Sequence, residues 1–151
     1  MHWSRLKKHI EGRFAKPLQG RVSLLYTRYR VKIYDDAARA SITLDGHEIV
    51  NMKSPWKAPA CGTSWRNELA AENIFEAHDF HNSLFQYLDM SISEIIESDN
   101  VIIRAIGMLD ARLGKRRLQR IDVTGDYELV KRLYALRCDV ENIACVGQFD
   151  R

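Results

Sequence analysis

The residues of this chain most able to do binding chemistry are Lys and Arg, and they gather in two places. One group alternates along a predicted strand, where a period of two puts its members on one face. The other group lies at and beyond the end of a predicted helix. Guanidinium and ammonium groups on a surface neutralise phosphates and carboxylates. The candidate binding residues are Arg28, Arg30, Lys32, Arg112, Lys115, Arg116, Arg117 and Arg120.

These cations belong to a chain whose charges are sorted into blocks. Residues 1–34 carry nine Lys or Arg against one acid, and residues 67–99 carry eight acids with no Lys or Arg. Residues 100–121 return to six cations against one acid, so the net charge of +3 hides the segregation. Segregated charge must be balanced inside the fold, across a subunit contact or on a charged partner.

Metal and acid–base chemistry have fewer residues to support them. His78 and His81 are the metal candidates, because two imidazoles at this spacing share one helix face. No third ligand is evident near them in the sequence, so we expect neither a metal nor a cofactor. The acids of residues 67–99 would serve a small hydrolase, but their spacing favours a solvated helix face instead. Phosphate-loop, nucleophile-elbow and dinucleotide motifs are absent from the sequence, and no catalytic residue is assigned.

The elements that must position the first basic group are a helix and a strand. An apolar stripe predicts the helix over residues 4–15. Alternating polarity predicts a strand over residues 22–33, with Leu25 and Tyr29 facing the core and Arg28 facing solvent.

Two further strands are predicted by a turn signal. Asp45-Gly46 separates residues 39–44 from residues 47–52, and this dipeptide is typical of a tight β-hairpin. A two-residue turn would place Ile42 opposite Ile49. The expected sheet is therefore a three-stranded antiparallel meander.

The second half of the chain has helical periodicity. Proline and glycine indicate a loop over residues 53–62, and four or five helices follow it. The predicted helical segments are residues 64–76, 79–90, 91–97 and 101–113, followed by a last long helix capped by Asp126. The sequence thus predicts a single α+β domain over residues 1–151. Its parts are a helix-plus-sheet half (1–52), the proline-containing loop (53–62) and a helical half (63–143).

Composition places the expected protein in the cytoplasm and away from membranes. Its 151 residues contain no apolar run of bilayer length, and the N-terminus lacks the apolar stretch of a secretory signal. Cys61, Cys138 and Cys145 form an odd and widely spaced set. Such a set favours reduced thiols over a disulfide framework.

Several motifs together resemble a known family. They are the opening Trp-Ser-Arg-Leu-Lys from Trp3, the hairpin around Asp45-Gly46, and the run Leu-Gly-Lys-Arg-Arg-Leu from Leu113. The set is similar to a small family of uncharacterised bacterial proteins of about this length. The resemblance implies a cytoplasmic bacterial protein, and it brings no activity, cofactor or catalytic residue.

Three functions fit these observations. We expect a non-catalytic binding or assembly module, plausible as a homo-oligomer, whose segregated charges meet each other or an acidic protein. The alternative is nucleic-acid binding through the basic strand face and the basic turn of residues 114–120. A small hydrolase is the third interpretation.

Overall fold

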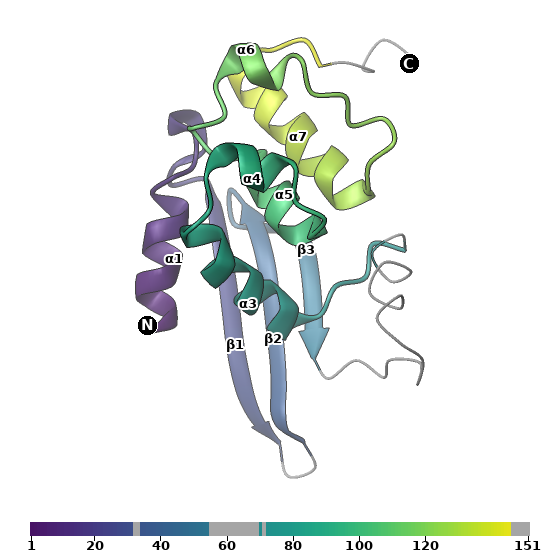
Figure 1. Ribbon diagram of the computed structural model, residues 1–151. Helices are drawn as coiled ribbons and strands as arrows, with labels where there is room; N and C mark the ends of the chain where they lie inside the picture. The colour runs from purple at the N-terminus through teal and green to yellow at the C-terminus, as the bar shows by residue number, and fades with distance from the viewer. Residues whose placement is uncertain (32–33, 55–69, 71, 146–151) are drawn as a thin grey trace.

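A three-stranded antiparallel sheet lies against a layer of helices in the computed structural model of the chain (Figure 1). The described residues are 1–31, 34–54, 70 and 72–145, with the side chains of residues 30–31 and 34–36 excepted. The strands, in the order β1-β2-β3, are β1 (Val22–Val31), β2 (Tyr34–Leu44) and β3 (His47–Ser54). The helical elements are α1 (Trp3–Glu11), a 3-10 turn η1 (Lys16–Leu18), α3 (Ala77–Leu88), α4 (Ile92–Ile96), α5 (Val101–Gly107), α6 (Lys115–Leu118) and α7 (Glu128–Glu141).

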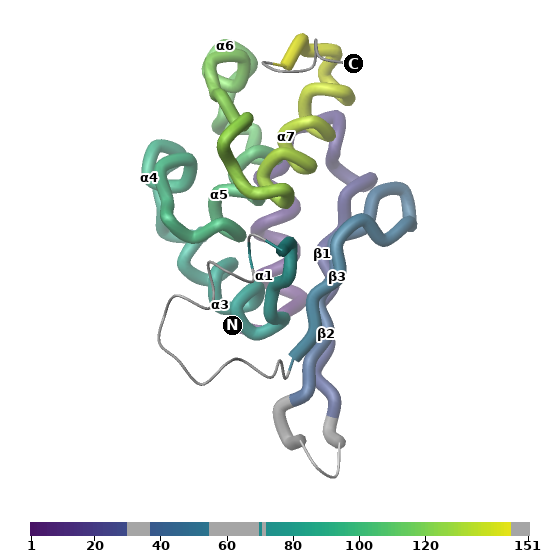
Figure 2. Tube along the Cα trace, turned by 90° about the vertical axis from the view of Figure 1, so that its right-hand side faces the viewer, coloured from purple at the N-terminus to yellow at the C-terminus, as the bar shows by residue number. Residues whose placement is uncertain are grey.

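This architecture confirms the predicted α+β class. The helices lie on one side of the sheet (Figure 2). The buried apolar residues of the described chain form one cluster, to which both the sheet and the helices contribute. No helix among the described residues has the length and apolar character needed to cross a membrane.

The hairpin of β2 and β3 follows its turn signal. Asp45 and Gly46 have φ values of 51° and 83°, the left-handed conformation that this turn requires at both positions. The expected pairing of Ile42 with Ile49 is wrong, because Ile42 lies opposite Val50. A bulge between Ile42 and Thr43 inserts one extra residue into β3 and shifts the register.

The predicted orientation of β1 is also wrong. Val22 and Leu24 are buried, whereas Leu25 and Tyr29 are 44% and 46% exposed. The amide of Leu24, which points along the plane of the sheet, donates to the Glu11 carboxylate at 2.8 Å and ties β1 to α1. The core face of β1 is therefore the one that also carries Tyr26 and Arg28.

Local caps set the starts of two helices as expected. Ser91 and Glu94 form a capping box at α4, and the Asn100 side chain accepts hydrogen bonds from the first turn of α5. At α7 the prediction needs correction. The N-cap is Tyr127, and the carboxylate of Asp126 accepts from the Tyr127 amide.

The predicted helix over residues 101–113 ends early, at Gly107. Residues 108–113 form turns, and Gly114 is the N-cap of α6 rather than the end of the preceding helix. Leu109 and Leu113 are still fully buried, so the apolar spacing persists where the helix does not. The periodicity was a signal of burial there, and burial alone does not specify a helix.

Part of the predicted organisation lies outside the described residues. This applies to residues 55–62 of the loop and to most of the segment predicted as a helix over residues 64–76. Within that segment, the described residues 72–76 are not helical. The next helix, α3, begins at Ala77, two residues before its predicted start.

The expectation of reduced thiols fails for two cysteines. Cys138 and Cys145 are joined by a disulfide with a Cα–Cα separation of 6.2 Å. The spacing of the cysteines in the sequence did not indicate this disulfide, because the bond closes only a local turn after α7. Cys61 lies outside the described residues.

Candidate functional site

The short helix α6 presents one of the two predicted basic groups to solvent. Leu118 is fully buried, and its carbonyl accepts a hydrogen bond of 3.1 Å from the buried Tyr134 hydroxyl of α7. With that residue facing the core, Lys115, Arg116 and Arg117 are all exposed. Anchoring one residue of a single turn thus turns its cations outward together, and the exposed Arg120 follows just beyond.

A buried carboxylate holds the loop that leads into α6. Asp110 is fully buried and pairs with Arg112, whose guanidinium Nη2 and backbone amide lie 2.8 Å from its oxygens. The Tyr87 hydroxyl donates a short hydrogen bond to the same carboxylate. Burial alone would raise the pKa of Asp110, but the hydrogen bonds from Arg112 and Tyr87 outweigh it and lower that pKa. Burial and the neighbouring carboxylate raise the pKa of Tyr87.

Arg137 fastens the same loop from α7. Its side chain is 2% exposed and donates to the carbonyls of Met108, Asp110 and Leu113 at 3.1, 2.8 and 2.7 Å. It also forms an ion pair with Glu141 at 2.9 Å. Because these carbonyls belong to no helix, the guanidinium supplies the donors that a helix would have supplied. Arg137 therefore positions the base of α6.

Helix α4 brings acidic residues beside α6. A guanidinium nitrogen of Arg117 donates to the Ser93 hydroxyl at 3.0 Å. Both helices lie on the side of the molecule away from the sheet (Figure 2). Helix α4 also packs closely on α5, because Gly107 of α5 lacks a Cβ, which would overlap the Ile95 side chain of α4. The exposed acids of this region are Asp89, Glu94, Glu97 and Asp99.

The eight candidate cations do not form one surface. The end of β1 that carries Arg28 lies at the opposite end of the molecule from α6 (Figure 1, Figure 2). Arg112 is tied to Asp110. The side chain of Arg30 and all of Lys32 lie outside the described parts of the chain. The structure therefore keeps Lys115, Arg116, Arg117 and Arg120 together and separates them from the strand group.

Beside Arg28, strand β1 instead brings Tyr26 to the two candidate histidines. The Tyr26 hydroxyl lies 2.9 Å from His78 Nδ1, and the His81 ring stacks on Tyr26 with centroids 4.4 Å apart. Trp3 and Phe85 flank His81. Burial lowers the pKa of His81, and nearby Arg28 and His78 lower it further. This aromatic cluster was not predicted, because the sequence analysis placed the wrong face of β1 toward the core and so put Tyr26 on the solvent side.

The sequence also raised a metal centre and a hydrolase centre. They contain no group of three or more His, Cys, Asp or Glu arranged to hold a metal ion. An open hollow of about 530 Å³ has Asp122 and Asp126 in its lining. Hydrogen bonds from Thr124 and Arg104 help keep the pKa of these two carboxyls low. Carboxylates held in the ionised form are poor proton donors at neutral pH.

The sequence matches the model of the SF0329 protein family over residues 2–62 and 56–138. The matched stretches run from α1 into α7 and include both α4 and α6. No curated protein and no solved structure matches the chain.

Proposed function

The chain belongs to the SF0329 protein family, an uncharacterised family, and we propose that it is a non-catalytic assembly module. Its partner in this proposal is a second copy of the same chain. The contact surface is a charged face made of the cations of α6 and the acids around α4. The residues of the charged face are Lys115, Arg116, Arg117, Arg120, Glu94, Glu97 and Asp99.

One observation carries the proposal: α4 and α6 are in contact through Ser93 and Arg117, yet their exposed charges stay unpaired with each other. No ion pair joins the two sets within the described chain, although Arg117 reaches Ser93 of α4. Elsewhere the chain does pair its arginines, for example Arg104 with Asp126. The cations of α6 and the acids around α4 are therefore available to a partner.

Adjacent patches of opposite sign favour a two-fold contact. A rotation of 180° about an axis between α4 and α6 brings the cations of each copy over the acids of the other. Such an interface is self-complementary and closes at two subunits. Half-buried Ile92 and Ile96 on α4 supply apolar surface within the same patch.

The energies of such contacts predict a weak and salt-sensitive dimer. An exposed ion pair contributes about 0–1 kcal/mol, and raising the ionic strength screens it. A two-fold interface repeats each pair twice, so several pairs add to the apolar contact at its centre. We expect association at low salt and dissociation at high salt.

The deciding experiment reverses each half of the charged face separately. Variant A carries Arg116→Glu and Arg117→Glu, and variant B carries Glu97→Lys and Asp99→Lys. Each should be monomeric alone, because like charges then face each other across the two-fold contact. Mixed together they should form a heterodimer, because both contacts become complementary again. Light scattering and sedimentation at low and high salt measure all three samples.

A matched control reverses two exposed cations outside the charged face, with Lys8→Glu and Lys16→Glu. This variant should associate like the unmodified protein. If the unmodified protein is monomeric at every salt concentration, self-assembly is refuted. Loss of dimer in variants A and B without recovery on mixing also refutes the two-fold arrangement.

Nucleic-acid binding is the second candidate, favoured by the three consecutive exposed cations of α6. In that case the affinity for a duplex or single-stranded oligonucleotide falls steeply with salt, and variant A loses most of that slope. Variant B keeps the slope, since it leaves the cations in place. The cytoplasmic location expected from the sequence stays a prediction under either function.

A further inference from the structure

The disulfide between Cys138 and Cys145 fastens the last described part of the chain. Cys138 lies near the end of α7 and is fully buried, and Cys145 is 3% exposed. Helix α7 ends where Asn142 adopts a left-handed conformation, and the Ile143 amide then donates to the Cys138 carbonyl at 2.9 Å. The turn therefore returns the chain to the side of α7 from which Cys138 projects.

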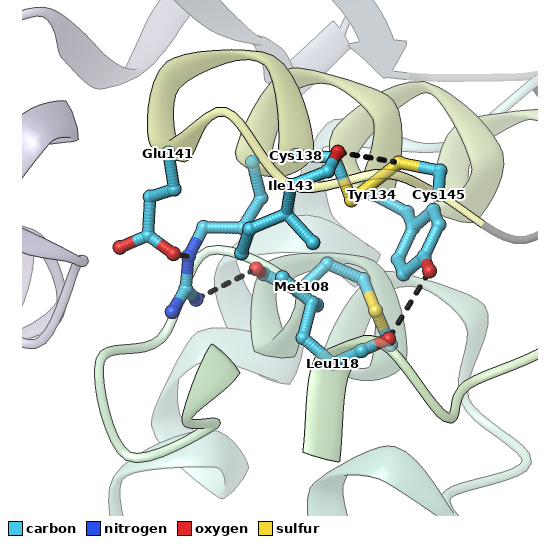
Figure 3. The surroundings of a disulfide bond; sticks show 8 residues. Met108, Leu118, Tyr134, Cys138, Glu141, Ile143 and Cys145 are labelled. Carbon is cyan, nitrogen blue, oxygen red and sulfur yellow. Dashed lines mark hydrogen bonds and ion pairs between the residues drawn. A yellow bond between two sulfur atoms is a disulfide. The ribbon is translucent and has the colours of Figure 1, made fainter. Parts of the chain in front are cut away.

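The same disulfide lies close to the anchor of α6. Tyr134 is one turn before Cys138 on α7, and its hydroxyl holds the Leu118 carbonyl. Figure 3 shows Tyr134 beside the disulfide, with its hydroxyl directed at Leu118. Tyr134 thus connects the disulfide at the end of α7 with Leu118, the last residue of α6.

We propose that Cys138 and Cys145 form a reversible thiol–disulfide latch. The latch holds residues 142–145 against α7 and, through Tyr134, restrains Leu118 at the end of α6. It opens by exchange with a low-molecular-weight thiol of the glutathione class. Two such thiols reduce the S–S bond to two cysteine thiols and leave as their own disulfide, so electrons and protons balance.

The location of the bond favours a reversible role. It links residues only seven positions apart, so it restrains the unfolded chain little. Most of the cluster of buried apolar residues comes from the sheet and from α1 and α3–α7, outside the turn of residues 142–145. Opening of a terminal turn is also a local event, which gives a thiol access to otherwise buried sulfurs.

The first experiment measures whether the latch responds to redox conditions in the folded protein. A Cys61→Ser background leaves only the two latch cysteines. The protein is equilibrated across ratios of reduced to oxidised glutathione, quenched, and labelled with a maleimide for mass spectrometry. We expect a change from two labels to none, while circular dichroism reports a folded protein throughout. A folded protein with no label at any ratio, or with two labels at every ratio, overturns the proposal.

The second experiment measures where opening is felt. Hydrogen exchange of the reduced form should be about tenfold faster at Ile143 and in the peptide containing Leu118. Peptides from β1, β2 and β3 should exchange unchanged. Cys145→Ser should show the reduced pattern in both redox states, and Ala144→Ser, at an exposed neighbour, should behave like the unmodified protein. Unchanged exchange at Leu118 in the reduced form would show that the disulfide does not restrain α6. These readouts do not require self-assembly, so the latch is tested independently of the proposed function.

Discussion

The turns of residues 108–113 and the one-turn helix α6 are neighbours in sequence, yet they use their charges in opposite ways. In the turns, Asp110 is buried and takes the guanidinium of Arg112 and the hydroxyl of Tyr87. In α6, three successive cations are exposed and reach no carboxylate of the described chain. Arg137 binds carbonyls of the turns, whereas Leu118 is the residue that α6 buries in the core.

The difference shows that a basic block in sequence is not a basic surface. Desolvated charges are costly unless they are paired, so the fold completes the pairs in the turns. Exposed charges keep their hydration and cost the fold little. We therefore expect substitutions in the turns to change stability and substitutions on α6 to change association.

The largest expected effect is that of Arg137→Met. The change leaves three loop carbonyls and Glu141 without their donor. We expect a loss of about 3–5 kcal/mol in the free energy of unfolding, measured by urea denaturation. Arg132→Met, at an exposed position of the same helix, is the control and should cost much less. Equal losses for the two variants would contradict the fastening role of Arg137.

Asp110→Asn should come next. An amide keeps the shape of the side chain but removes the charge that Arg112 and Tyr87 meet. We expect a loss of about 2–3 kcal/mol by the same measurement, because hydrogen bonds to charged groups are the stronger ones. An unchanged midpoint would show that the pairing with Arg112 is worth no more than a surface contact.

Tyr87→Phe isolates the single hydroxyl of this network. The ring stays to pack, but Asp110 loses one donor. The expected loss is about 1–2 kcal/mol. A double variant with Asp110→Asn should lose less than the sum of the two single losses, since both changes remove one contact. Additive losses would mean that the hydroxyl and the carboxylate act separately.

Lowering the pH should reduce the contribution of Asp110 in the turns to the free energy of unfolding. The pKa of Asp110 is lower in the folded protein than in the unfolded chain, because Arg112 and Tyr87 favour its ionised form. Its contribution is therefore present above the unfolded pKa of about 3.9 and is lost as the pH falls through the folded value. Unfolding measured between pH 7 and pH 3 should be less pH-dependent for Asp110→Asn than for the unmodified protein. Identical profiles would contradict this assignment.

The smallest expected change in stability is that of Arg116→Ala. The residue is exposed and forms no ion pair within the described chain, so unfolding should change by less than about 0.5 kcal/mol. The same variant should weaken the salt-dependent association proposed for the charged face. A loss of stability comparable to that of Tyr87→Phe would show that the Arg116 side chain makes a contact that stabilises the fold.

Sequence signals succeeded where a feature depends on a few neighbouring residues. Asp45-Gly46 formed the hairpin, and Ser91 with Glu94 began α4, because turns and caps are satisfied locally. The run from Lys115 was expected to follow the end of the preceding helix, but it forms a helix of its own.

The same signals failed where distant residues compete for the chain. The orientation of β1 depends on whether Leu24 or Leu25 enters the core, and both fit an alternating pattern. The end of α5 depends on Arg137, which lies far along the chain and supplies donors to the turns. The aromatic cluster at Tyr26 was not predicted because it depends on the orientation of β1.

By itself, the amino-acid sequence determined the α+β class, the hairpin turn, the N-caps of α4 and α5 and the blocks of charge, since each follows from composition or from contacts a few residues apart. Only the tertiary structure decided which cations stay exposed, how β1 is turned and that Cys138 meets Cys145. Burial and pairing depend on residues that folding brings together, and neither is encoded in any one segment.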